Sequence, residues 1–288
     1  MGMFEKWNQL PPEMRYECVK LLDFKSRMQL RGASKADKWL VESTKHSFEH
    51  VYIQLQFDAK IDNLRIFCYK ERKCNSPCLT NEHKTRRVTP EFLQKALLLV
   101  VQFLKFAVIN SFHLTWFGRE NEVPKLLNLL SDVGPMRFES LSLKTEHTKL
   151  SEFFLKNCVG VKSIGLMGMF EEDLTSFQLV IDAKTVGVSI KNKSDMPRRM
   201  IEKWIENDVE IGKVLRTWFR HQESLEDWCS EFPNRVLYSS DTKIRLRTDN
   251  PAKHILIRSE FLKPDIMAVM SVGERPTVIA TVIPSDGY

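Results

Sequence analysis

The chain has 288 residues, of which 43% are hydrophobic and 28% charged, and its formal net charge at pH 7 is +6. This composition excludes a disordered chain, and the length fits one or two domains. The apolar stretch at 96–109 is interrupted by Gln102 and Lys105, so we expect no membrane span. Acidic residues near the start argue against a secretory signal. We therefore expect an intracellular protein, cytoplasmic or nuclear, whose six cysteines stay reduced.

The positive charge is concentrated in residues 60–88, which carry a net charge of +5. Turn-forming residues and the lack of apolar periodicity predict a long loop there. A basic loop can contact an acidic partner, although a solvated surface loop is the commoner case. The possible contact residues are Arg72, Lys73, Lys84, Arg86 and Arg87.

Residues 1–47 are predicted to form three short helices. Pro11 and Pro12 suit the first turn of the first helix. Four residues then fall on one face of it: Met14, Cys18, Leu21 and Leu22. Asp23 can cap a second helix that runs to Leu30, and Ser34 with Asp37 matches a capping box for a third. Because so small a unit buries little surface, we expect the rest of the chain or a partner to cover its apolar face.

From residue 48 the pattern alternates with a period of two, which predicts a strand at 51–57. Thr89-Pro90-Glu91 is a typical helix start, and the helix it opens is predicted to run to about Ile109 and to be deeply buried. Further strands are expected at 113–117, 138–143, 162–167 and 185–190, with helices between them at 123–130, 149–158 and 173–180.

This alternation of strand and helix predicts a repeat fold. If Leu114, Leu141, Ile164 and Val186 are equivalent positions, the strand–helix unit recurs every 22 to 27 residues, as in a leucine-rich-repeat-like solenoid. The regular Asn of such repeats is missing, so we expect an irregular one. A helix at 197–206, strands at 214–219, 235–238, 243–247 and 254–258, and a terminal hairpin within 266–283 are predicted to follow. The predicted class is α/β, with three helices in 1–47 and an αβ repeat-like domain in 48–288.

The start of the chain resembles the F-box in spacing and residue type. The resemblance covers residues 4–47 and is carried by Leu10-Pro11, Glu13-Met14, Cys18-Val19, Leu22, Arg27, Leu30-Arg31, Ser34-Lys35 and Trp39-Leu40-Val41. With Trp7 before it and the segment 27–35 after it, the string is similar to the large F-box family of nematodes. The remaining chain is similar to the F-box-associated regions of that family. Cys18 departs from the pattern, because a larger aliphatic residue is usual there.

The resemblance implies a substrate receptor of a Skp1-cullin-F-box ubiquitin ligase. Its partners would be a Skp1-type adaptor and, through it, a cullin, together with a target protein bound by the larger domain. Residue by residue, it implies that seven positions contact or shape the adaptor surface: Leu10, Pro11, Met14, Val19, Leu22, Leu30 and Trp39. No bond chemistry and no cofactor is expected. The alternative is a nucleic-acid-binding or structural repeat protein that uses the basic loop and has no ligase role.

The sequence matches few of the motifs that carry chemistry in enzymes. His46-Ser47-Phe48-Glu49-His50 fits H-x-x-E-H, which binds zinc when both imidazoles share a helical face. Here a helix is predicted to end near Ser43 and a strand to begin by Val51, so we expect no zinc site. A second set, Cys68, Cys74, Cys78 and His83, lacks the tight first pair of a structural zinc site. Four tryptophans could stack on bases, but core packing is the preferred interpretation for all of them: Trp116, Trp204, Trp218 and Trp228.

Overall fold

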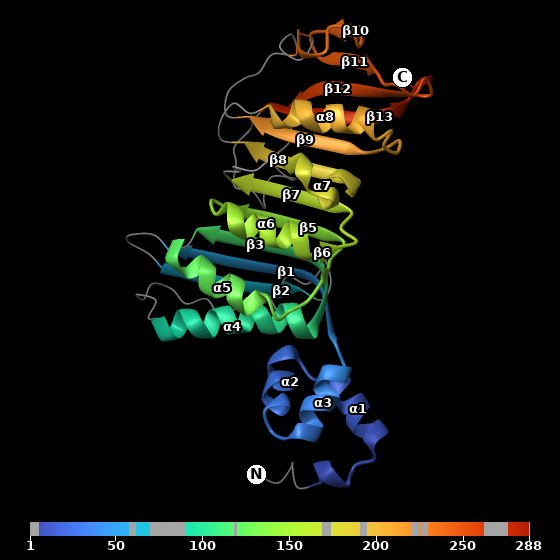
Figure 1. Ribbon diagram of the computed structural model, residues 1–288. Helices are drawn as coiled ribbons and strands as arrows, with labels where there is room; N and C mark the ends of the chain where they lie inside the picture. Colours follow the sequence, from blue (N-terminus) through green and yellow to red (C-terminus); the bar gives the residue numbers. More distant parts are fainter. Residues whose placement is uncertain are drawn as a thin grey trace.

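The computed structural model describes residues 6–57, 62–69, 90–117, 120–168, 174–190, 195–219, 225, 230–261 and 276–287. A small helical unit lies at the N-terminal end, and a long mixed sheet with helices along one face makes up the rest (Figure 1). The α/β class predicted from the sequence is therefore confirmed. Within the described ranges, no helix is both long enough and apolar enough to cross a membrane.

The helical unit consists of η1 (Trp7–Gln9), α1 (Pro12–Leu21), α2 (Phe24–Arg31) and α3 (Lys35–Ser43). Both predicted caps are present. Asp23 Oδ1 accepts a hydrogen bond of 2.7 Å from the Ser26 N–H, and Ser34 Oγ accepts one of 3.1 Å from the Asp37 N–H. These side chains satisfy N–H groups that the first turn of a helix leaves free, which is why α2 and α3 begin where the sequence predicts.

Eleven strands of the described chain form one sheet, in the order β10-β11-β12-β13-β9-β8-β7-β5-β3-β1-β2. Six strands pair parallel with one another: β1, β3, β5, β7, β8 and β9. The remaining strands of this sheet, β2 and β10 to β13, pair antiparallel with their neighbours. Their bounds are β1 (His46–Phe57), β2 (Asp62–Tyr69), β3 (Ala107–Phe117), β5 (Ser140–Thr145), β7 (Ser163–Gly168), β8 (Thr185–Ile190), β9 (Val214–Phe219), β10 (Val236–Ser240), β11 (Lys243–Arg247), β12 (Lys253–Phe261) and β13 (Pro276–Pro284). The short strands β4 (Met136–Arg137) and β6 (Cys158–Val159) pair separately.

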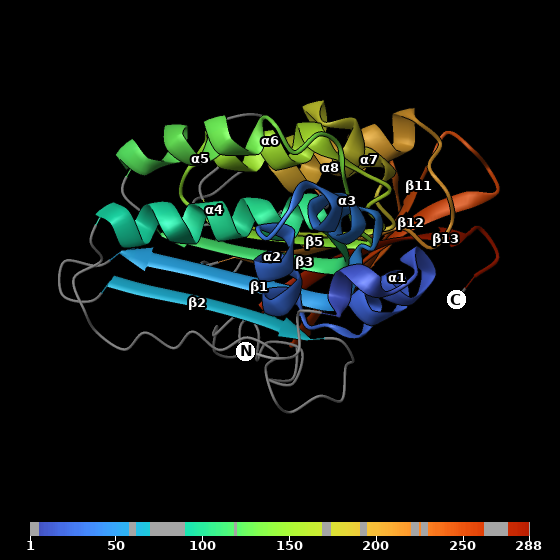
Figure 2. The ribbon, with the colours of Figure 1, turned by 90° about the horizontal axis from the view of Figure 1, so that it is seen from below.

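Helices connect the parallel strands in chain order and cover one face of the sheet. They are α4 (Pro90–Phe106), α5 (Val123–Leu130), α6 (Thr148–Asn157), α7 (Gln178–Asp182) and α8 (Met196–Glu206), with short 3₁₀ turns η2 (Glu120–Glu122) and η3 (Leu174–Ser176). Figure 2 shows these helices on the same side of the strands. Alternate strand residues such as Leu143 and Leu166 pack with helix residues such as Phe154 and Ile201 in one buried core. We call the opposite side of the sheet the helix-free face.

Three expectations for residues 60–117 are wrong. Asp62–Tyr69 is strand β2 rather than loop, because its backbone pairs with β1 from His50 to Phe57. The long helix ends at Phe106, and β3 begins at Ala107, because Ile109 and its neighbours pair with β1 instead. The same helix is not buried on every side, since Leu98 is 41% exposed. A short apolar run suits a helix or a buried strand equally well, so the pattern could not place this boundary.

The predicted equivalence between strands is wrong by two residues at one position. Leu141 is paired across β3 and β5 with Phe112, and Leu114 is paired with Leu143. The other equivalences are confirmed, because Leu141, Ile164 and Val186 align across β5, β7 and β8. Residues two apart in a strand share one face, so periodicity alone cannot decide which of them is aligned with the next strand.

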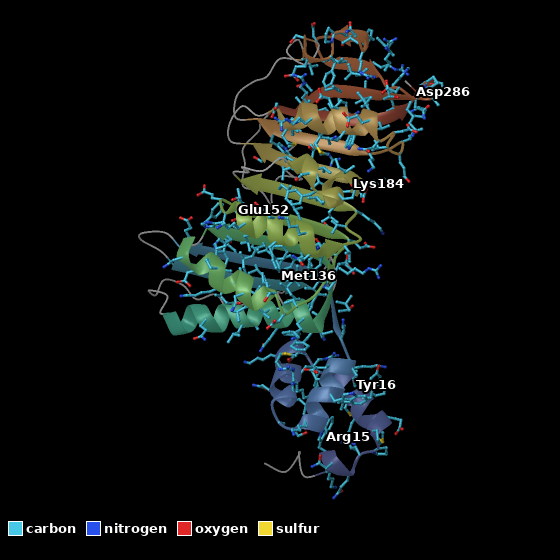
Figure 3. The ribbon with its side chains drawn as sticks, viewed as in Figure 1. Arg15, Tyr16, Met136, Glu152, Lys184 and Asp286 are labelled. Atoms are coloured by element: carbon cyan, nitrogen blue, oxygen red, sulfur yellow. The ribbon has the colours of Figure 1, made fainter. Side chains whose placement is uncertain are left out.

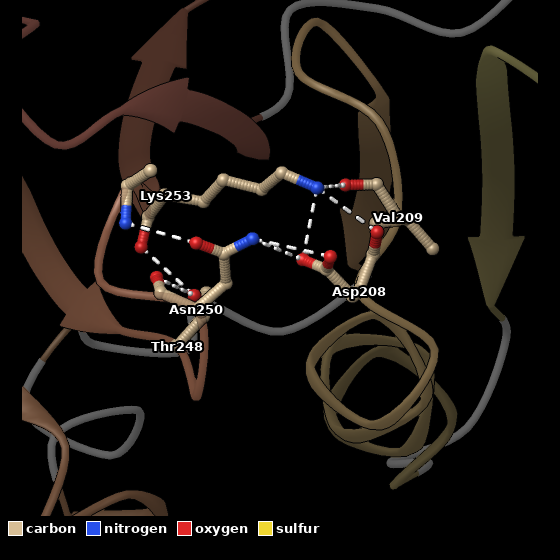
Figure 4. Close-up of polar contacts among 6 residues, drawn as sticks. Asp208, Val209, Thr248, Asn250 and Lys253 are labelled. Atoms are coloured by element: carbon tan, nitrogen blue, oxygen red, sulfur yellow. Dashed lines mark hydrogen bonds and ion pairs between the residues drawn. The ribbon is translucent and has the colours of Figure 1, made fainter.

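The C-terminal strand β13 does not lie at the edge of the sheet. β13 lies between β12 and β9, so its pairing joins the antiparallel strands to the parallel ones. The first apolar run and the turn of the predicted terminal hairpin, at 262–275, lie outside the described residues. A polar cluster strengthens the same junction (Figure 4): the side chains of Asn250 and Lys253 both donate to the carboxylate of Asp208, which follows α8.

Candidate adaptor-binding surface

The helical unit has its own small core. Val19, Leu30, Leu40 and Val41 are buried, with 0 to 8% of their surface exposed, and they pack together. Trp7, Tyr16, Leu22 and Met28 cover this core at its edges and are partly buried. Four buried aliphatic side chains are few for a folded unit, so its stability needs further contacts.

Arg27 supplies some of these contacts through a buried guanidinium group. Its Nη1 donates to the Thr44 carbonyl at 2.6 Å, its Nη2 to the Lys20 carbonyl at 2.7 Å, and its Nε to the Leu22 carbonyl at 3.1 Å. Two of these carbonyls lie near the end of α1 and the third follows α3, so one side chain from α2 holds all three helices together. Burial lowers the pKa of Arg27.

Asp37 connects the beginning of the unit to α3. Its Oδ1 accepts a hydrogen bond of 2.8 Å from the indole N–H of Trp7, and its Oδ2 accepts one of 2.7 Å from the Ser34 hydroxyl. The side chain is buried, and each of its two carboxylate oxygens accepts a hydrogen bond from a different segment. This contact fixes the segment before Leu10 and Pro11 against the helices.

The unit is also attached to the sheet through an aromatic cluster. The Phe24 ring lies parallel to the Phe103 ring of α4 at 4.2 Å, and it meets the Phe48 ring of β1 edge-on at 5.7 Å. Beside them, the Arg31 guanidinium lies 4.3 Å from the centre of the Phe106 ring. Phe24 therefore belongs to the core of the sheet domain although it lies on α2.

Large apolar side chains on α1 and α3 remain exposed after these contacts. Leu21 is 86% exposed, Trp39 is 72% exposed and Met14 is 54% exposed. Met14 and Leu21 lie seven positions apart on α1 and share its outer side, which is the side opposite the buried Val19. A Trp side chain with this exposure is unusual on a surface that contacts only water.

The seven residues implied by the resemblance divide into two groups. Pro11, Met14 and Trp39 are exposed, and Leu10 is partly exposed, so all four are accessible to a partner. Val19 and Leu30 are buried and Leu22 is half-buried, so these three shape the surface from within. Leu21 was not among the seven, although its spacing from Met14 is a signal that could have identified it.

The other candidate site residues lie partly within and mostly outside the described residues. His46 and His50 both lie in β1, so they share no helical face. Arg72, Lys73, Lys84, Arg86 and Arg87 lie outside the described residues, as do Cys74, Cys78, His83 and Trp228. Within the ranges that the structure covers, no group of three metal-ligating side chains is present. Trp116, Trp204 and Trp218 are buried, so core packing is confirmed for these three.

Comparisons with known proteins add no family assignment. No protein-family model matches the chain, and a search of curated proteins finds no match.

Proposed function

We propose that the chain is a substrate-receptor adaptor of a Skp1-cullin-F-box ubiquitin ligase. The observation that carries the proposal is the exposure of Met14 on α1 and Trp39 on α3, two large apolar side chains that the F-box resemblance assigns to adaptor binding. In the proposal they are the main anchors of one adaptor surface, which Leu21 extends along α1. A Skp1-type protein binds this surface and connects the chain to a cullin.

The energetics of the helical unit support this assignment. A few apolar anchors that become fully buried can supply most of the affinity of an interface, and Trp is among the strongest of them. A partner that binds only the folded unit also stabilises it in proportion to its concentration. The unit suits such binding because its core is small while Arg27, Asp37 and Phe24 hold its helices in place.

In this proposal the sheet domain binds the target protein and performs no bond chemistry. The Phe24 cluster attaches the helical unit to the N-terminal part of the sheet domain. A target bound on the sheet domain is then held at a defined distance from the adaptor. Holding a target lysine near a charged ubiquitin-conjugating enzyme accelerates transfer through proximity.

The test is co-purification of the full chain with a Skp1-type protein. Met14→Asp and Trp39→Ala should each abolish recovery of the adaptor in near-equal amount, because an interface anchor is lost. Leu237→Asp is a matched control: Leu237 is 52% exposed, close to the 54% of Met14, but it lies on β10 at the far edge of the sheet. Circular dichroism checks that all variants are folded.

Two results would contradict the proposal. The first is adaptor binding that survives both substitutions, or that Leu237→Asp reduces equally. The second is the absence of adaptor binding together with salt-sensitive RNA or DNA binding that is lost when Arg86 and Arg87 are neutralised. That second result would support the nucleic-acid-binding alternative.

A further inference from the structure

The helix-free face of the parallel strands has an unusual composition. On β3, β5, β7, β8 and β9, every second residue faces away from the helices, and the described residues at these positions include no carboxylate. Nine of these positions hold small or hydroxyl-bearing residues: Ser111, Thr115, Ser140, Ser142, Ser163, Gly165, Thr185, Gly187 and Ser189. Larger uncharged residues occupy five more, which are His113, Phe117, Met167, Val214 and Trp218. The two cations among them are Lys144 on β5 and Arg216 on β9. Among the described residues, these five strands therefore carry positive charge on this face without an acidic residue.

Lys144 is a half-buried cation without a carboxylate partner among the described residues. Its ammonium nitrogen lies 5.6 Å from the centre of the Phe117 ring. Burial lowers the pKa of Lys144, and no acidic group acts in the opposite direction. A partly buried charge that lacks an opposite charge costs free energy. A carboxylate from another molecule would remove that cost.

The neighbours of Lys144 do not neutralise it. His113, on the adjacent strand, has its pKa lowered to about 4 by burial and by the charge of Lys144, so it is neutral at pH 7. Its ring lies parallel to the Tyr52 ring at 4.4 Å, and its Nε2 is 3.0 Å from the Thr115 hydroxyl oxygen. These contacts hold Tyr52, His113 and Thr115 in place and leave the charge of Lys144 uncompensated.

Within the described chain, Arg216 on β9 is a second cation without a partner, and small residues of β7 and β8 separate it from β5, which carries Lys144. Its Nε is buried and has no hydrogen-bond partner, and no ion pair of its guanidinium is found among the described residues. Gly187 is paired with Arg216 across β8 and β9, and Gly165 is paired with Gly187 across β7 and β8. Small residues therefore occupy the row from Ser142 on β5 to Gly187 on β8, and the Trp218 ring of β9 lies over Gly187. A segment that reaches both cations crosses these small residues and the edge of the indole.

We propose that the helix-free face binds an acidic segment of the target protein, with one carboxylate at Lys144 and a second at Arg216. The assignment rests on the proposed adaptor function, because it identifies the surface with which that adaptor binds its target. Three strand spacings and two residues separate the two cations, which is roughly 16 Å. In an extended segment this distance corresponds to carboxylates about five residues apart.

The test uses the full chain in complex with the Skp1-type protein and a random peptide library displayed on phage. Selected peptides should be enriched in Asp and Glu at the stated spacing. Lys144→Gln and Arg216→Gln should each weaken the selected peptides about tenfold, because a charge-assisted contact is lost. Lys144→Arg should retain binding. Lys184→Gln is the matched control, because Lys184 is exposed and lies just before β8 (Figure 3).

Three outcomes would overturn the inference. One is a library that yields no binders or binders without acidic residues. Another is acidic binders that the double variant Lys144→Gln, Arg216→Gln retains at full affinity. The third is a single-stranded RNA oligonucleotide that binds more tightly than any peptide and depends on the same two cations. Because the adaptor complex is measured with the same variants, intact adaptor binding in each case shows that the proposed function stands and only the target surface is wrong.

Discussion

The Phe24 ring of α2 stacks on the Phe103 ring of α4, with 4.2 Å between ring centroids and 9° between ring planes. This stack joins the helical unit to the core of the sheet domain. It converts an N-terminal segment that is too small to be stable alone into part of a larger cooperative structure. Its removal should therefore affect both parts of the chain.

Phe24→Ala should lower the free energy of unfolding by about 3–5 kcal/mol, because a buried aromatic ring is lost and a cavity remains. It should also make the segment around Thr44 sensitive to limited proteolysis, since the helical unit loses its attachment to the sheet. Phe154→Ala is the control: Phe154 is fully buried in α6, away from the helical unit. It should destabilise the chain by a similar amount without the new cleavage. Equal cleavage in both variants would contradict the attachment.

Arg27→Ala should destabilise the chain by about 3 kcal/mol, because buried carbonyl groups of Lys20 and Thr44 lose a charged donor. Urea titration measures the loss. Arg198→Ala removes an exposed guanidinium that pairs with Glu202 on α8, and it should change stability by less than about 0.5 kcal/mol. Arg27→Lys should recover only part of the stability, since one ammonium group cannot reproduce the planar fork. An Arg27→Ala variant as stable as Arg198→Ala would exclude the structural role of Arg27.

The contact between Asp208 and Lys253 should make stability depend on pH. Hydrogen bonds from Lys253 and Asn250 lower the pKa of Asp208 in the folded chain (Figure 4). Since the folded pKa lies below the unfolded one, the contact stabilises the fold above about pH 4 and is lost as the pH falls further. Asp208→Asn should therefore lower the thermal midpoint more at pH 7 than at pH 3. Asn also accepts the positive φ of 45° at this position.

A double-mutant cycle separates this contact from other effects of pH. Combining Asp208→Asn with Lys253→Met should give less than the sum of the single effects at pH 7, because the two side chains form one ion pair of 2.8 Å. At pH 3 the coupling should be smaller. Coupling of the same size at both pH values would show that the charge of Asp208 is not its source.

Gly187→Ala should destabilise the sheet by about 1–3 kcal/mol through overpacking. A Cβ at Gly187 would lie 2.9 Å from the Trp218 ring, a distance that forces the indole to move. Gly165→Ala is a matched control on the neighbouring strand, since its Cβ would meet the Ser142 hydroxyl oxygen at 3.4 Å and the side chain can adjust. Tryptophan fluorescence should change only in the first variant. Two variants of equal stability would mean that the Trp218 ring does not need the space above Gly187.

Several elements were predictable from the sequence because their signals are local. The helix at Val123–Leu130 and the strands at Thr185–Ile190, Val214–Phe219 and Lys243–Arg247 have the predicted bounds. The caps at Asp23 and Ser34 were also predicted correctly, since a cap depends only on a side chain and the N–H groups two or three residues later. The exposed Met14 and Trp39 came from the resemblance rather than from periodicity, which placed Met14 on the apolar side of its helix.

The sequence by itself determined most of the order of helices and strands, apart from β2, β4 and β6, together with the ends of several helices and the residue types of the candidate surface. Only the tertiary structure decided that Phe24 leaves the helical core for the sheet and that β13 lies between β12 and β9. It also decided that Lys144 and Arg216 share the helix-free face of the strands from β3 to β9, where the described residues include no carboxylate. The physical reason is the separation along the chain over which each interaction acts. Capping and periodicity act within a few residues, whereas strand order, register and the charge of a sheet face depend on segments far apart in the chain.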